Sequence, residues 1–341
     1  MMDLKNIEQS IIDKELQKIF KRNDPFILNG HMGAVIYLMM KPDKNSLVRA
    51  KAYLNKITKN INNDSRLEIG HGLCGISLGC MFMIKNGFAA KEVSHLPISI
   101  ESYIYRSVCY KMSMGYDNNV VDTLLDVALY TVYRINKSVM STYQRGIQIR
   151  LLMDMIDYIH LGEGFAHRLE PMPASLNFYL FRLLLVLSGA VSLPECKPRI
   201  IHIIQELELP IVSSFPYSEY NRLLLLCGLR QLHKEISLSS RYNEHITLLE
   251  QNTSIKRIIQ EEFLSNNLSF VNGLVGLYLI CSLFNDFTSC DESLFSKKIL
   301  SSDIYSEQNY SVISTKQFGG LNGILGLDLM ISTLIQRNQY A

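Results

Sequence analysis

Apolar positions along this chain follow a helical period in two alternating styles. In one kind of segment nearly every position over several turns is apolar, as in "GAVIYLMM" (33–40) and "LCGISLGCMFMI" (73–84). In the other kind, apolar residues recur every three or four positions with charges between them, as in "KNSLVRAKAYLNKITKNI" (44–61) and "RGIQIRLLMDMIDYIHL" (145–161). A helix that is apolar all round is buried, whereas an amphipathic helix covers a core with one face. The alternation therefore predicts an all-α protein with inner apolar helices wrapped by amphipathic ones.

Four of the apolar segments begin with the same glycine spacing. They are "NGHMGAVIYLMM" (29–40), "GHGLCGISLGCMFMI" (70–84), "NGLVGLYLICSLF" (272–284) and "GGLNGILGLDLMI" (319–331). The glycine pairs are Gly30/Gly33, Gly72/Gly75, Gly273/Gly276 and Gly320/Gly323. An interior glycine costs a helix roughly 0.5–1 kcal/mol relative to alanine, so the pairs need a reason. Small residues at i and i+3 share a helix face, and we expect them to let neighbouring inner helices approach closely. The alternative is a tight turn into each helix.

The intervals between these pairs predict a repeat. Positions 30 and 72 are 42 residues apart, 273 and 320 are 47 apart, and the 201 residues from 72 to 273 divide into four steps of about 50. Hidden repeats are therefore predicted near 122, 172 and 222, where "VVDTLLDVALYTVYRI", "PASLNFYLFRLLLVL" and "NRLLLLCGLRQL" have the apolar helical pattern. Seven helical hairpins would close into a single α/α toroid domain over 1–341, or stay open as a solenoid. Residues 1–24 are predicted to contain an N-terminal amphipathic helix.

Composition and charge narrow the class of protein. Hydrophobic residues make up 48% and charged residues 19%, which is typical of a globular protein with a large core. Lys and Arg (34) nearly balance Asp and Glu (32), so neither nucleic acid nor an anionic membrane is an expected partner. Seven scattered cysteines without a CxxC pair or a secretory signal indicate reduced thiols and a cytoplasmic location. The apolar stretch 176–194 contains Arg182, so we expect a buried helix and no stable membrane insertion.

The glycine-marked phrases resemble the lanthionine synthetase C-like (LanC-like) family, especially its divergent variants in bacterial peptide-maturation clusters. The resemblance is carried by "GHGLCGISLGCMFMIKNGF" (70–88), "NGLVGLYLI" and "GGLNGILGL", and it covers residues of about 25–95 and 265–335. The middle of the chain matches in period alone. The resemblance implies an α/α toroid that takes part in maturation of a ribosomally made, lanthipeptide-type peptide. Enzymes of the family use zinc to activate a peptide cysteine thiolate, which adds to a dehydrated serine or threonine.

The family's zinc ligands are missing at the matching positions. Those ligands are a cysteine in a Trp-Cys phrase and an adjacent Cys-His before a later Gly-x-x-Gly. This chain has Val271 and Asn272 before Gly273, has no tryptophan, and has Cys227 about a turn too deep in its predicted helix. We therefore expect no zinc and no other cofactor, and we predict that the protein binds a precursor peptide or a partner modification enzyme. The alternatives are a zinc-independent thioether cyclase, another peptide-modifying enzyme, or a non-catalytic helical interaction scaffold.

Polar residues near the predicted starts of the inner helices are the candidate site. His31 and His71 are predicted to project into the cavity mouth as acid–base groups or as donors that bind a peptide. Asn29, Asn272 and Asn322 are predicted to bind substrate. His167 is a third catalytic candidate, because the loop "HLGEGFAHRLEPMP" (160–173) precedes the predicted fourth inner helix, where the family enzymes place a functional histidine. The alternative for the rim residues is that they cap helices or bond to neighbouring backbone, and the alternative for His167 is a solvated loop.

Chemistries of other α/α toroids are not indicated. No Asp-Asp-x-x-Asp cluster is present to bind a magnesium diphosphate, and the absence of tryptophan argues against the aromatic subsites of glycosidases. Asp122 and Asp126 form an isolated i, i+4 pair. Cys74 stands three residues after His71, a spacing that suits a nucleophile and its base, although a buried thiol is the commoner outcome.

Overall fold

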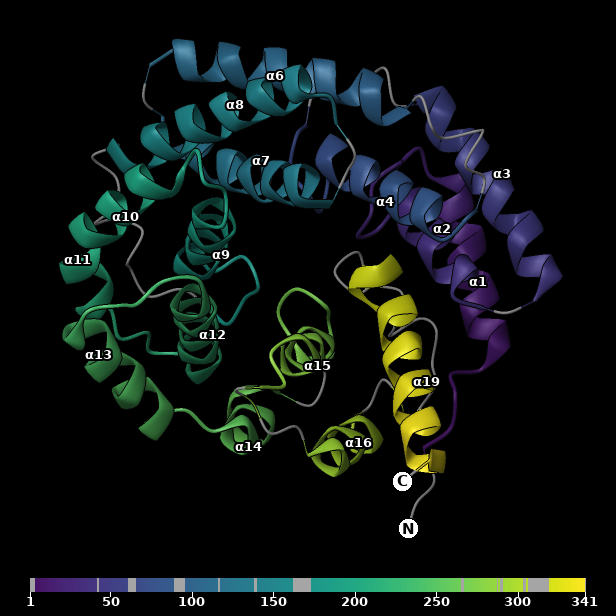
Figure 1. Ribbon diagram of the computed structural model, residues 1–341. Coiled ribbons are helices and arrows are strands. Elements are labelled where there is room, and N and C mark those ends of the chain that lie inside the picture. Colours follow the sequence, from purple (N-terminus) through teal and green to yellow (C-terminus); the bar gives the residue numbers. More distant parts are fainter. Residues whose placement is uncertain are drawn as a thin grey trace. The chain divides into compact units, whose positions relative to one another are not determined.

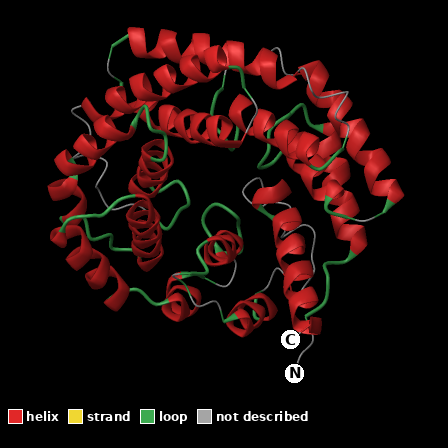
Figure 2. Ribbon diagram, in the orientation of Figure 1, coloured by secondary structure: helices red, strands yellow, loops and turns green. Residues whose placement is uncertain are grey.

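In the computed structural model, helices joined by loops and turns make up the residues that it describes. These are 4–41, 43–60, 66–88, 96–115, 117–137, 140–161, 173–264, 267–286, 288, 291–302, 305 and 319–340. No strand occurs among them, which confirms the predicted all-α class (Figure 2). Within the same residues, no helix combines the length and the apolar character needed to cross a membrane.

The helices group into two compact units (Figure 1). The first unit combines Met1–Ile100 with Ile255–Ala341, and the second is the continuous segment Glu101–Ser254. Closure of all the hairpins into one toroidal domain stays a prediction.

The first unit contains the four glycine-marked helices. They are α2 (His31–Met39), α4 (Leu73–Lys85), α15 (Leu274–Leu283) and α19 (Ile324–Tyr340). Helix α2 packs against α4 and α19, and α19 also packs against α15, so the first and last of these helices are neighbours. Amphipathic helices cover them, namely α1 (Gln9–Lys21), α3 (Lys44–Asn60) and α16 (Glu292–Leu300). The short helix α14 (Ile255–Arg257) and a π-helical turn, Ile258–Glu262, complete the unit.

The second unit contains the three helices predicted from the repeat interval. They are α7 (Asn118–Lys137), α9 (Tyr179–Val191) and α12 (Glu219–Glu235), and α9 packs between the other two. Each is followed by a helix that packs on it, namely α8 (Thr142–Leu161), α10 (Lys197–Glu206) and α13 (Ser240–Gln251). Helix α6 (Leu96–Ser113) enters the unit from the first one, and the short α11 (Glu208–Val212) follows α10. The three helices predicted near 122, 172 and 222 are confirmed as helices, and their division into an inner and an outer layer stays a prediction.

Two carboxylates, the exposed Asp122 and the partly buried Asp126, explain the arginine within the apolar stretch of α9. Arg182 is 8% exposed, and its Nη2 and Nη1 atoms lie 2.5 Å from Asp122 Oδ1 and 3.0 Å from Asp126 Oδ1. Residues at i and i+4 share one helix face, so both carboxylates of α7 point towards the same guanidinium. The isolated acidic pair of the sequence is therefore the partner that makes a buried charge tolerable.

Candidate functional site

The loops that precede the glycine-marked helices join into a band of main-chain hydrogen bonds within the first unit. We call this band the loop belt and define it as residues 24–30, 66–72, 267–273 and 319–323. Leu28 N–H donates to the Gly70 carbonyl (3.2 Å), and Asn322 N–H donates to the Leu28 carbonyl (3.1 Å). Phe270 N–H donates in turn to the Asn322 carbonyl (2.9 Å). Loops whose bonded residues are up to 294 positions apart, as Leu28 and Asn322 are, are thus linked edge to edge.

Each loop also folds back over the start of its own helix. His31 N–H donates to the Asp24 carbonyl (2.8 Å), Leu73 N–H to Arg66 (3.0 Å) and Leu274 N–H to Asn267 (3.0 Å), so the connection is the same in three repeats. The first N–H groups of a helix have no partner within the helix. These loops supply main-chain carbonyls to them, and α2, α4 and α15 have no side-chain cap.

Crowding by the loop explains the first glycine of each pair. A Cβ atom would stand 2.4 Å from the Asp24 carbonyl oxygen at Gly30, 2.4 Å from Glu68 N at Gly72, and 2.3 Å from the Asn267 carbonyl oxygen at Gly273. The φ angles of these glycines are −117°, −150° and −152°, which other residues also adopt. Space, and not backbone conformation, excludes a side chain.

The second glycine of the first two pairs is crowded by the same loop. A Cβ atom at Gly33 would stand 2.1 Å from the Ile27 carbonyl oxygen, and at Gly75 it would stand 1.9 Å from the Ile69 carbonyl oxygen. Contacts with a neighbouring element come next, at 3.2 Å from Leu321 and 3.0 Å from Ile27 respectively. The expected helix–helix packing contributes less than the fold-back of the loop.

The glycine register of the last repeat differs from the predicted one. Helix α19 begins at Ile324, directly after Gly323, and a Cβ atom at Gly326 would stand 2.2 Å from the Leu321 carbonyl oxygen. The repeated pair is therefore Gly323/Gly326, and the predicted pair Gly320/Gly323 is wrong.

Gly320 has a separate role in the belt. Its φ of +59° lies in the left-handed region that favours glycine, and its N–H donates to Glu15 Oε1 (3.0 Å), a buried carboxylate of α1. With the corrected register, Asn29, Asn272 and Asn322 occupy one position, the residue before the first glycine. His71 occupies it in the second repeat.

The structure brings these four predicted residues into the belt but gives them different surroundings. Asn322 Oδ1 accepts a hydrogen bond from Val271 N–H (2.9 Å), and the Asn29 amide can donate to the Gly319 carbonyl (2.6 Å). Both side chains are partly buried and hold loops together, whereas His71 and Asn272 are exposed. Roles in catalysis and substrate binding stay predictions for all four.

His31 is buried, so the prediction that it projects into an open mouth is wrong. Its exposed fraction is 0%, and its ring lies 5.8 Å from that of Tyr53 on α3, close to the carbonyls of Ile19 and Phe20 on α1. Neither ring nitrogen makes a well-formed hydrogen bond with the described residues. Burial, followed by the charge of Lys56, lowers the pKa of His31. The amphipathic helix α1 supplies the cover that the local pattern around His31 did not reveal.

The remaining candidates do not assemble into a site. His167 lies outside the described residues. Cys74 is fully buried within α4, whereas His71 is exposed in the turn before it, so their spacing does not create an accessible nucleophile and base. His160, at the start of the segment 160–173 that contains His167, is the last-turn histidine of α8, and its Nε2 atom lies 2.7 Å from Glu206 Oε2 on α10.

Donor chemistry in the described residues does not match the zinc site of the family. Val271 and Asn272 lie in the loop before α15, where the resemblance places Cys-His. Cys227 is buried in α12, and burial raises the pKa of its thiol to about 12, which disfavours the thiolate that zinc needs. Among the described residues, no group of three or more His, Cys, Asp or Glu side chains could hold a metal ion.

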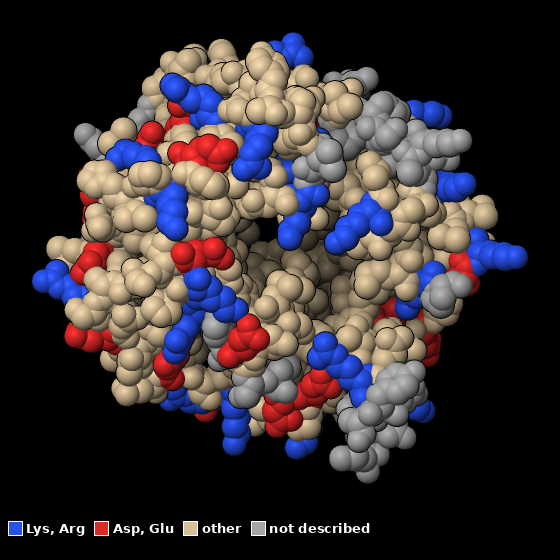
Figure 3. Space-filling model, viewed as in Figure 1, with Lys and Arg blue, Asp and Glu red and all other residues tan. Residues whose placement is uncertain are grey.

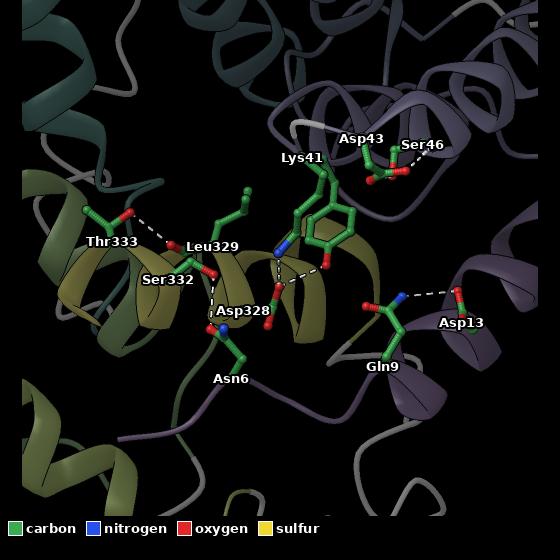
Figure 4. A network of polar contacts seen from close by, with 11 residues as sticks. Asn6, Gln9, Asp13, Lys41, Asp43, Ser46, Asp328, Leu329, Ser332 and Thr333 are labelled. Carbon is green, nitrogen blue, oxygen red and sulfur yellow. Dashed lines mark hydrogen bonds and ion pairs between the residues drawn. The ribbon is translucent and has the colours of Figure 1, made fainter. Parts of the chain in front are cut away.

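A polar network that sequence reasoning missed joins α2 to α19. Asp328 is 2% exposed and accepts hydrogen bonds from Tyr37 Oη (2.8 Å) and Lys41 Nζ (2.7 Å), as Figure 4 shows. Burial, followed by the nearby Asp328 charge, raises the pKa of Tyr37 above its usual range. A cavity of about 310 Å³ lies beside it, and its lining includes Asp13 and Arg49. The lone aspartate in the apolar run "GLDLM" was the one sequence signal for this network.

Comparison with known proteins does not identify a family. A scan against protein-family models finds no match to the chain, and a search of the curated proteins finds none either. The resemblance to LanC-like proteins therefore rests on the quoted phrases.

Proposed function

We propose that this protein is a LanC-like α/α toroid that binds a ribosomally made precursor peptide, or the enzyme that modifies it, across the loop belt. One observation carries the proposal. The same polar position of four repeats, Asn29, His71, Asn272 and Asn322, falls within one hydrogen-bonded band. The contact between α2 and α19 supports closure of the toroid, because it joins the first and last glycine-marked helices.

The exposed belt groups suit recognition of a peptide main chain. An extended peptide presents an N–H donor and a C=O acceptor at nearly every residue. The amide of Asn272 donates and accepts hydrogen bonds, and so does the neutral imidazole of His71. Asn29 and Asn322 hold the loops that position these two side chains. Such a surface can bind peptide backbone without requiring one sequence.

The residues at the family's zinc-ligand positions favour a role in peptide binding over zinc activation of a substrate thiol. Zinc that activates a substrate thiol is bound by thiolate and imidazole groups, with one position open. Val271 offers no donor, and the neutral amide of Asn272 is a poor zinc ligand. The proposal therefore assigns the chain a binding role in peptide maturation and no LanC-type zinc step.

The test uses the full chain and fluorescein-labelled precursor peptides encoded beside its gene. Fluorescence anisotropy should show saturable binding, weakened about five- to tenfold in the His71→Ala/Asn272→Ala variant, because two exposed hydrogen-bonding groups are lost. The matched control is His233→Ala/Asn252→Ala, which removes an exposed histidine and an exposed asparagine of the second unit and should leave affinity unchanged.

Three results would overturn the proposal. The peptides could fail to bind, or both double variants could lose affinity equally. Stoichiometric zinc in the purified protein, with thioether rings formed in a dehydrated peptide and detected by mass spectrometry, would restore the cyclase hypothesis.

A further inference from the structure

Positive charge is concentrated in one part of a nearly neutral chain. Residues 9–60 contain ten Lys and Arg but four Asp and Glu, whereas the whole chain contains 34 and 32. The remainder of the chain is therefore slightly acidic. The cationic segment forms α1, α2 and α3, and its charges lie on the two outer helices, α1 and α3, and in the connections beside them.

All four acidic side chains of this segment are engaged within the fold. Asp13 Oδ1 lies 2.7 Å from Arg49 Nη1, and the buried Glu15 accepts the Gly320 N–H. Asp24 and Asp43 accept main-chain N–H groups of Phe26 (3.0 Å) and Ser46 (2.8 Å). Glu15 is buried, and the ten cations outnumber the three carboxylates that stay at least partly exposed, Asp13, Asp24 and Asp43, so the segment keeps a net positive charge.

Helix α3 concentrates this charge on a single face. It has 17 residues, five of them Lys or Arg and none acidic, and spans about 25 Å. Ala50, Tyr53, Leu54 and Ile57 form its buried side. The exposed residues of the opposite side include Lys44, Leu47, Val48, Lys51, Asn55 and Lys59, and we call this side the basic face. Lys and Arg side chains recur along the edge of the molecule where α3 runs (Figure 3).

The stability of α3 does not explain the composition of this face. Lys44 is the first residue of the helix, where the positive end of the helix dipole disfavours a cation. No acid within α3 can pair with Lys44, Lys51 or Lys59 at i±4. Val48 is 69% exposed and Leu47 40% exposed, so two aliphatic side chains lie in water between the lysines. Each of these features becomes favourable when an acidic, partly apolar partner covers the face.

We propose that the basic face of α3 binds an acidic polypeptide segment that contains aliphatic residues. Helix α1 extends the surface, because it runs beside α3: the Tyr53 hydroxyl donates to the Leu16 carbonyl, and Lys56 Nζ lies 3.8 Å from the centre of the Phe20 ring. A shallow hollow of about 530 Å³ on α1 is lined by further cations and one amide, namely Lys14, Gln17, Lys18, Lys21 and Arg22. The inference is independent of the function proposed for the loop belt.

A polypeptide fits the observations better than nucleic acid or lipid. Leu47 and Val48 can be buried by aliphatic side chains of a peptide, whereas phosphate groups gain nothing from them. Surfaces for single-stranded nucleic acid use several exposed aromatic rings. On α3 the one ring, Tyr53, is buried, and on α1 the Phe20 ring, which is 37% exposed, already has Lys56 over it. Helices that lie in a lipid interface insert a broad apolar face, and that face of α3 already packs inside the protein.

The experiment uses the full chain and a fluorescein-labelled Glu/Leu peptide long enough to span α3. Anisotropy should show saturable binding that weakens as NaCl is raised, because the attraction is screened. In Lys44→Glu/Lys51→Glu/Lys59→Glu, affinity should fall about tenfold or more, since each reversal replaces an attraction with a repulsion. The matched control, Lys137→Glu/Lys197→Glu/Lys297→Glu, makes the same change in net charge at exposed sites elsewhere and should stay within about twofold of the original affinity.

A second variant separates the possible partners. Leu47→Gln/Val48→Gln should weaken binding of the peptide while leaving any binding of duplex DNA unchanged. Equal losses in the two lysine variants would overturn the proposal, because they would show an unlocalised charge effect. It would also be overturned by tighter binding of duplex DNA, or of phosphatidylglycerol vesicles, than of the peptide.

Discussion

Replacing Gly75 by alanine tests the explanation of the glycine pairs, with Gly146 as its counterpart. Both glycines lie within helices, α4 and α8, where alanine is intrinsically favoured by about 1 kcal/mol. At Gly75 the added Cβ would stand 1.9 Å from the Ile69 carbonyl oxygen and 3.0 Å from Ile27 Cγ2. At Gly146 it would meet nothing within 4 Å. The same substitution should therefore have opposite effects at the two positions.

The magnitude at Gly75 follows from what must move. The Ile69 carbonyl has to retreat by more than about 1 Å to reach an ordinary C···O separation. Its loop is held by hydrogen bonds from Leu28 N–H to Gly70 and from Leu73 N–H to Arg66. Losing two such bonds costs about 1–3 kcal/mol, and overpacking adds about 1–3 kcal/mol. After subtracting the helix preference of about 1 kcal/mol, we expect Gly75→Ala to lower the free energy of unfolding by about 1–5 kcal/mol.

Urea denaturation followed by far-ultraviolet circular dichroism measures both variants. Gly146→Ala should raise the free energy of unfolding by about 0.5–1 kcal/mol. Amide hydrogen exchange adds a local measurement, because opening of the loop belt in Gly75→Ala should speed exchange of the Leu28 and Leu73 N–H groups. A Gly75→Ala protein as stable as the original, with unchanged exchange in the belt, would refute the crowding argument.

Three further predictions concern buried groups. Asp328→Ala should lower the free energy of unfolding by about 2–3 kcal/mol, because it leaves Tyr37 Oη and the partly exposed Lys41 without their hydrogen-bond acceptor. Asp154→Ala, which breaks the exposed Arg150–Asp154 pair, should change it by less than about 0.5 kcal/mol, and equal effects of the two substitutions would contradict the burial of Asp328. Burial lowers the pKa of both His31 and His245, so the unfolded chain takes up protons more readily; stability should be full above about pH 6.5 and fall below it, and urea midpoints against pH should flatten in His31→Phe/His245→Phe. In a Cys290→Ser background, Ellman's reagent should label the partly exposed Cys109 in the native protein but reach Cys80 and Cys227 after denaturation alone, since burial raises both of their pKa values to about 12; native labelling of Cys227 would contradict this.

Periodicity was sufficient to predict the helices because burial on all sides requires apolar residues on all sides. The intervals between glycine pairs located α7, α9 and α12 even though these helices lack the pair. The glycine spacing also indicated close approach. It could not say whether a neighbouring helix or the preceding loop makes that approach, because both readings produce the same small residues. In "FGGLNGILGL" several pairings fit the pattern, and the geometry selects Gly323/Gly326.

The candidate site depended on contacts that local patterns do not contain. His31 and His71 each stand next to the first glycine of a pair, Gly30 and Gly72. Nothing in the neighbouring sequence shows that the first imidazole is buried and the second exposed. The cover of His31 comes from Ile19 and Phe20 of α1. The link between Lys41 and Asp328 spans 287 positions, and a single aspartate in an apolar run does not name its partner.

The first unit is built from two segments of the chain, one before and one after the second unit, and this order affects how the unit forms during synthesis. When residues 1–100 leave the ribosome, α2 lacks α19, and Tyr37 and Lys41 lack Asp328. The continuous segment Glu101–Ser254 can gather its own helices during that interval. Contacts between residues distant in sequence form slowly because a long loop must first close. The first unit therefore completes its core after translation has passed α19, and until then the apolar surface of α2 that packs against α19 is exposed to chaperones and to other nascent chains.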